Sequence, residues 1–95
     1  MATRGVREVV AGTSQIGVRD GPVADARVLP YAGLAVLPDG RVVFSDGGSG
    51  RVRIIAQGEV RTLANVLLPG GLALAPGGAL VVAGTGAGVL LRLSP

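Results

Sequence analysis

The chain has 95 residues, 48% of them hydrophobic, and its nine Arg and six acidic residues give a net charge of +3. This length allows one small domain, and the apolar content is too high for wholesale disorder. There is no Cys and no His, which excludes a disulfide framework and removes the commonest general base and transition-metal ligand.

Neither a nucleic-acid surface nor a membrane span is expected. The Arg residues are scattered, and only Tyr31 and Phe44 are aromatic, whereas nucleic-acid surfaces usually combine a basic stripe with aromatic rings. The first ten residues lack the apolar segment of a signal peptide, and the uncharged stretch between Arg61 and Arg92 is rich in helix-breaking Gly. We expect a cytoplasmic location by default.

In chain order the sequence predicts short strands separated by glycine-rich turns, and therefore an all-β fold. Residues 5–11 form the first strand, and a long connection at 12–30 contains a turn at 19–22. Pro38-Asp39-Gly40 is a hairpin turn. The run Val42-Val43-Phe44 does not alternate with polar residues, which indicates a sheet covered on both faces. The later predicted strands are 33–37, 41–46, 51–56, 60–64, 72–74, 79–83 and 89–93.

Residues 33–55 recur as a weaker copy at 71–93, with eight of 23 aligned positions identical. Self-similarity of this period, with several short strands per copy, is typical of β-propellers built from four-stranded antiparallel blades. If the strands of a blade are called a to d, the chain reads d-abcd-abc, a single two-blade unit over 1–95. Residues 33–64 form a complete blade, and 71–95 form a blade that lacks its outer strand. We expect residues 5–11 to supply that strand to a neighbouring chain, because an open edge invites pairing.

The central motif resembles the NHL-repeat β-propellers. GLAVLPDGRVVFSDGGSGRVRII is similar to a typical blade of that family, and VAGT at 10–13, DGP at 20–22 and ADA at 24–26 match the stretch that often precedes one. The family's D-x-x-N-N-R turn corresponds to Asp46 and Arg51, with Ser49 and Gly50 in place of the two Asn. The second copy has Gly84 and Val89 at the Asp and Arg positions.

The resemblance implies a ring, usually of six blades, which two blades cannot close. Three copies joined head to tail give six blades and four give eight, and we expect the homotrimer. The predicted function is a non-catalytic, self-assembling scaffold or binding platform for a protein or small ligand, without a cofactor or metal. A bare ring-forming unit is also typical of an engineered or reconstructed propeller fragment. The alternative is an excerpt of a longer NHL-type propeller, lactonase- or lyase-like or RNA-binding, whose active residues lie outside this chain.

The predicted binding residues lie on the connections that propellers of this type gather on one side of the disc. Structural roles are open beside ligand contact: Asp46 can accept hydrogen bonds from the glycine turn that follows it, and Arg51 can pair with Asp46. Asp20 and Asp25 can pair with Arg19 and Arg27 across the loop. No catalytic residue is predicted, because Ser14 and Ser45 lack a His base. The predicted binding residues are Arg19, Asp20, Asp25, Arg27, Tyr31, Asp46 and Arg51.

Overall fold

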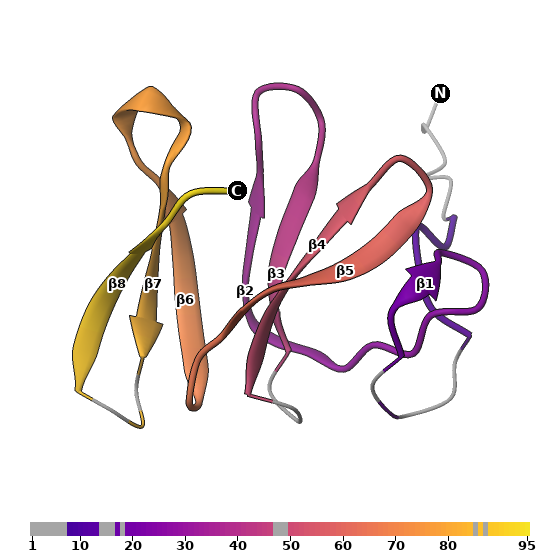
Figure 1. Cartoon of the computed structure of the whole chain (residues 1–95), viewed down its shortest axis with the longest axis horizontal. Coiled ribbons are helices and arrows are strands. Elements are labelled where there is room, and N and C mark those ends of the chain that lie inside the picture. Colours follow the sequence, from indigo (N-terminus) through magenta and orange to yellow (C-terminus); the bar gives the residue numbers. More distant parts are fainter. Residues whose placement is uncertain (1–7, 14–16, 18, 47–49, 85, 87) are drawn as a thin grey trace, which may run out of the picture.

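The chain forms two antiparallel sheets that lie side by side (Figure 1), which confirms the all-β prediction. The structure is a computed structural model and describes residues 8–13, 17, 19–46, 50–84, 86 and 88–95. The first sheet has the order β1-β5-β4-β3-β2 and the second β6-β7-β8. The strands are β1 (Gly21–Pro22), β2 (Pro30–Val36), β3 (Val42–Asp46), β4 (Arg51–Ala56), β5 (Glu59–Asn65), β6 (Pro69–Leu74), β7 (Leu80–Gly84) and β8 (Val89–Leu93).

Tight turns join β2 to β3 and β4 to β5. At the predicted Pro38-Asp39-Gly40 turn, Gly40 has a φ of 93° and its N–H donates to the Leu37 carbonyl at 2.9 Å. Gln57 and Gly58 both have positive φ, 52° and 75°, which is the backbone of a two-residue hairpin whose twist matches the strands. In the second sheet the 3₁₀ turn η1 (Pro76–Gly78) takes the place of the first of these turns.

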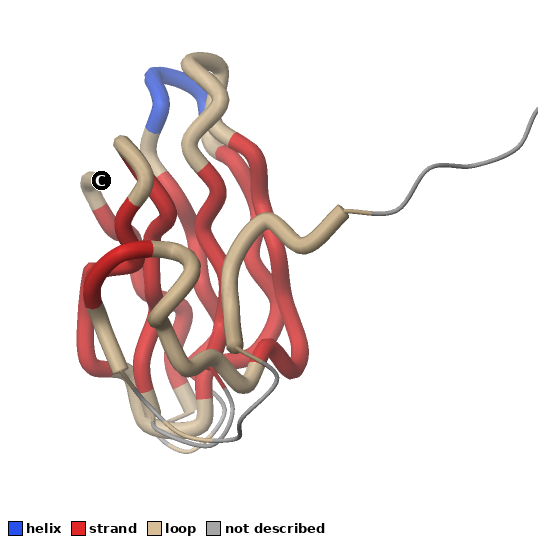
Figure 2. Tube along the Cα trace, turned by 90° about the vertical axis from the view of Figure 1, so that its right-hand side faces the viewer, coloured by secondary structure: helices blue, strands red, loops and turns tan. Residues whose placement is uncertain are grey.

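The first sheet packs against the second through one face and is partly covered on the other, in line with the unbroken apolar run in β3. Val43 is fully buried and points toward the second sheet, where it joins a core with Val52, Leu80 and Val82. Phe44 points the other way and is buried with Ala26 and Val60. That second cover comes from the 19–29 loop, whose Val23 and Val28 also pack there; the side of the molecule that carries β1 and this loop faces the viewer in Figure 2.

The two sheets make their closest approach at β2 and β6. A Cβ atom on Gly33 would lie 2.7 Å from the backbone nitrogen of Leu72 and 2.8 Å from the Gly70 carbonyl oxygen. The Ser45 hydroxyl donates to that same carbonyl at 2.6 Å. Glycine at position 33 is therefore required by packing, since any side chain there would push the sheets apart.

The predicted N-terminal strand is not formed in the single chain. Its described residues, 8–11, belong to no strand, and residues 5–7 lie outside the described part. Instead Val10 and Ala11 lie beside Phe44 and Ile55 on the side of the first sheet that faces away from the second. The described residues of the second sheet contain three strands, as predicted, and pairing of 5–11 with a neighbouring chain stays a prediction.

Candidate binding face

The connections between β3 and β4, β5 and β6, and β7 and β8 lie on one side of the molecule (Figure 1). Hydrogen bonds between their described residues tie them together: Val66 N–H donates to the Gly50 carbonyl at 2.9 Å, and Gly86 N–H donates to the Leu67 carbonyl at 3.3 Å. These three connections therefore lie together. The hairpin turns at 38–40 and 57–58 lie at the opposite end.

The centre of the polar cluster is Arg53, which the sequence analysis did not select. It lies opposite Phe44 in the β3–β4 register, and its guanidinium carbon is 5.9 Å from the ring centroid. The Arg53 side chain is completely buried. A charged group taken out of water needs partners for its N–H donors, and the loop supplies them.

Two carboxylates and one carbonyl engage the Arg53 guanidinium. Nη1 donates to Asp46 Oδ2 at 3.0 Å and to the carbonyl oxygen of Arg27 at 2.6 Å. Nη2 and Nε donate to Asp20 Oδ1 at 2.8 and 3.3 Å. All three nitrogens are engaged, so Arg53 holds the 19–29 loop on the sheet and is not available to a ligand.

Asp46 and Asp20 each bind a second element as well. Asp46 Oδ2 also accepts the Leu29 N–H at 3.1 Å, while Oδ1 is buried with no hydrogen-bond partner among the described residues. Asp20 Oδ2 accepts the N–H and the hydroxyl of Thr62 at 3.0 and 2.9 Å. The two carboxylates therefore join the loop to β3, β4 and β5. The predicted bonds from the turn after Asp46 fall on residues 47–49, outside the described part.

These contacts set the protonation of Asp20. Its burial acts to raise the pKa, but hydrogen bonds from Arg53 and Thr62 outweigh that effect and hold the pKa of Asp20 below its ordinary value of 3.8. The carboxylate is thus stabilised in the charged form that Arg53 requires.

Two predicted ion-pair assignments were wrong. Asp46 pairs with Arg53 and not with Arg51, because Arg53 lies deeper on the same face of the sheet. Asp20 also pairs with Arg53 instead of a loop arginine. Arg19 and Arg27 face each other through backbone hydrogen bonds, both 3.1 Å, that close the loop.

The other predicted residues lie around this cluster. Asp25 is exposed in the turn after β1, and its N–H donates to the Pro22 carbonyl at 2.9 Å. Arg51 is half-buried at the start of β4. Tyr31 lies within β2, and its side chain is outside the described part. The structure therefore brings Asp20 and Asp46 together, with the Arg27 backbone, while Arg19 and Asp25 remain at the exposed rim.

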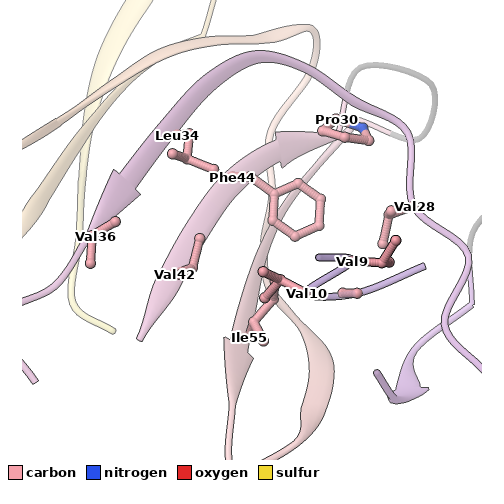
Figure 3. Close-up of a pocket in the computed structure, with 10 residues that line it drawn as sticks. Val9, Val10, Val28, Pro30, Leu34, Val36, Val42, Phe44 and Ile55 are labelled. Atoms are coloured by element: carbon pink, nitrogen blue, oxygen red, sulfur yellow. The ribbon is translucent and has the colours of Figure 1, made fainter. Parts of the chain in front are cut away.

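An apolar pocket of about 360 Å³ lies next to the cluster on the far face of the first sheet, the face directed away from the second sheet (Figure 3). Phe44 and Ile55 form its floor, and Leu34 and Val36 extend along β2 with 62% and 55% of their surfaces exposed. Sequence reasoning missed this pocket because the same residues read as ordinary core. The lining residues are Val9, Val10, Ala11, Val28, Pro30, Leu34, Val36, Val42, Phe44 and Ile55.

No protein-family model matches the chain, and no significant match was found among curated proteins or solved structures. The resemblance to NHL repeats therefore rests on the sequence motifs alone. Within the described residues no group of His, Cys, Asp or Glu is arranged to hold a metal ion. The described residues also contain no helix that is long and apolar enough to cross a membrane.

Proposed function

We propose that the chain is a non-catalytic, self-assembling β-propeller module, with three copies associating head to tail into a closed ring of six blades. The observation that carries the proposal is a match between internal and open surfaces. Two sheet faces remain exposed wholly or in part in the single chain: the outward face of the second sheet, and the far face of the first sheet, which the 19–29 loop covers only in part. These faces are the repeat counterparts of the two faces that pack against each other inside the chain.

Gly33 and Gly71, equivalent in the 38-residue repeat, illustrate this match. A Cβ atom on Gly33 would collide with the β6 backbone, whereas one on Gly71 would meet no atom within 4 Å. Neither glycine has the positive φ that favours this residue, so backbone conformation does not explain Gly71. A glycine is useful at position 71 if another backbone approaches it, as β6 approaches Gly33.

The match also fixes the kind of contact. The open face of the second sheet corresponds to the packed face of the first sheet. The second sheet of one copy would therefore contact the first sheet of the next copy, and the two contacting surfaces differ. Such heterologous contacts generate closed rings when the rotation per copy permits. Three copies give the six blades usual for the family that the sequence resembles, and four copies give eight.

The position of residues 8–11 supports completion of the second sheet by a neighbour. The repeat allows two offsets for this segment, 54 from Val6-Arg7 and 53 from Ala11. The offset of 53 aligns Val10 and Ala11 with Leu63 and Ala64 of β5, which pack against the core between the sheets. Val10 and Ala11 pack in the corresponding place on the far face of the first sheet. This position supports the proposal that the segment acts as the outer strand of a preceding blade.

The ring would present the connection side of every copy on one surface, where a protein or small ligand can bind. Arg19 and Asp25 are exposed on the 19–29 loop, which the Arg53 ion pairs hold on the rigid sheet. Loops fixed by a scaffold commonly supply binding residues. The proposed role is therefore that of a scaffold whose loop surface is repeated around a ring.

Multi-angle light scattering on the purified chain tests the proposal. We expect a discrete species with three times the 9.4 kDa chain mass. A folded monomer over the same concentration range would contradict self-assembly. A chain that folds only when further blades are supplied in trans would instead favour an excerpt of a longer propeller, whose own blades cover these faces.

A further inference from the structure

The apolar pocket on the far face of the first sheet has the composition of one half of the core between the two sheets. Five of its lining residues fall within the repeat 33–55, and the counterparts of four of them, 38 positions later, pack in that core. The four pairs are Leu34/Leu72, Val42/Leu80, Phe44/Val82 and Ile55/Leu93, while Leu74, the counterpart of Val36, is 44% exposed. The pocket is therefore a core surface that lacks its opposing sheet.

Inside the chain, the opposing half of that core is supplied by the first sheet. Val43, Val52 and Ile54 contribute it from β3 and β4, and Val52 is fully buried. The counterparts of these residues are Val81, Leu90 and Arg92, on the face of the second sheet that points away from the first. Leu90, the counterpart of Val52, is 76% exposed. The single chain thus carries an unfilled apolar pocket on one sheet and an exposed apolar side chain on the other.

We infer that Leu90 of one copy inserts into the Phe44–Ile55 pocket of the next copy and is the anchor of the ring contact. The inference rests on the proposed function and names the residues through which it acts. A second copy is the occupant because the chain's own β2–β6 packing provides the geometry, with each face meeting the counterpart of its internal partner. Buried apolar anchors in pockets commonly dominate the energy of such contacts.

Two outward-facing residues of the second sheet differ in chemistry from their equivalents in the first repeat, and the differences favour Leu90 as the anchor. Ala83 stands where the first repeat has Ser45, so the hydroxyl bond to the Gly70 carbonyl has no equivalent between copies. Arg92 stands where the first repeat has Ile54; its aliphatic stem can cover apolar surface while the guanidinium reaches water. The apolar counterparts on this face are Val81, Ala83 and Leu90. Leu90 is larger than Val52, its equivalent in the first repeat, and is the most exposed of the three, so we expect it to contribute most to the contact.

Two single-face variants and their mixture test this contact. Leu90→Arg blocks the anchor, and Leu34→Arg blocks the pocket of the receiving copy, where Leu34 is 62% exposed. An unpaired charge buried in the contact should weaken each association by about a hundredfold, so each variant alone should be a folded monomer. An equimolar mixture retains one intact anchor and one intact pocket, and should form a dimer of two chains and nothing larger.

The matched control is Leu67→Arg, which changes a leucine of similar exposure, 64%, on the connection between β5 and β6. It should remain trimeric. Circular dichroism checks each fold, and Leu90→Ser and Leu34→Ser replace any arginine variant that fails to fold. If the unchanged chain is a folded monomer, the proposed function fails and this inference with it. If the unchanged chain assembles but the variants also assemble, or their mixture stays monomeric, the inference alone is overturned.

Discussion

At the scale of single residues, Arg53 is the group on which the polar part of the fold depends. It is fully buried, and its partners Asp46 and Asp20 come from β3 and from the loop. The signal in the sequence was weak: Arg53 is a charge in the middle of a strand expected to be covered on both faces. Because Arg51 occupies the turn-arginine position of the family that the sequence resembles, sequence reasoning paired Asp46 with Arg51, whereas the structure pairs Asp46 with Arg53.

Replacing Arg53 should be costly. In Arg53→Met the Asp46 carboxylate stays buried without its counter-charge, and we expect a loss of about 3–5 kcal/mol in the free energy of unfolding. Urea titration followed by circular dichroism measures it. Arg51→Met is the matched control, since Arg51 is half-buried and makes no ion pair within the described residues. Equal losses in the two variants would contradict the structural role assigned to Arg53.

Acid should release the loop through Asp20. Its pKa is held below the ordinary 3.8 in the folded chain, so the unfolded state binds more protons between the two values. This contribution to stability is therefore complete above the unfolded pKa and is lost as pH falls through the folded one. Thermal melts from pH 6 to pH 2 should show a smaller loss in Asp20→Asn than in the unchanged chain. Parallel curves for the two proteins would show that Asp20 does not couple to folding.

At the scale of elements, turn chemistry and apolar patterning predict the seven strands β2 to β8 and their antiparallel order. The boundaries differ at the start of β2 and β6, which begin at Pro30 and Pro69, three residues before the predicted starts. Proline lacks an N–H and reads as a turn residue, but it is tolerated at the first position of an edge strand, and both are edge strands. The short strand β1 was not predicted because Gly21–Pro22 reads locally as a turn. Tertiary contacts place it beside β5: its pairing with Glu59 and Val60, and the bond from the Thr62 N–H to Asp20.

The β4–β5 hairpin contains a residue that is poorly suited to its conformation. Gln57 has a φ of 52°, where asparagine is favoured over residues with longer side chains. We expect Gln57→Asn to raise the free energy of unfolding by about 0.5 kcal/mol, part of the roughly 1–2 kcal/mol that a left-handed conformation costs an ordinary residue. Chemical denaturation measures the change. The β-branched Gln57→Val should be destabilising, and the reverse order would contradict the turn assignment.

At the scale of the whole molecule, the repeat determines what the chain can do. The sequence alone predicts two copies of one unit, and the structure packs them together through β2 and β6, with the 19–29 loop on part of the far face of the first sheet. That cover depends on the buried contacts of Arg53 and Ala26, which have no local signature, so the composition of the pocket was not predictable. The register of both sheets decides which side chains share a face. Without it, the sequence does not show that the exposed faces are equivalent to the two faces packed inside the chain.

The space beside Gly71 tests the central claim most directly. A Cβ atom there meets nothing within 4 Å in the single chain, but in the ring it would lie against the backbone of the neighbour's β2, as a Cβ on Gly33 would lie 2.7 Å from the Leu72 nitrogen. We predict that the Gly71→Ala chain folds and unfolds cooperatively as a single copy but sediments as a monomer. The unchanged chain should sediment as a trimer. A Gly71→Ala chain that still sediments as a trimer would contradict the account.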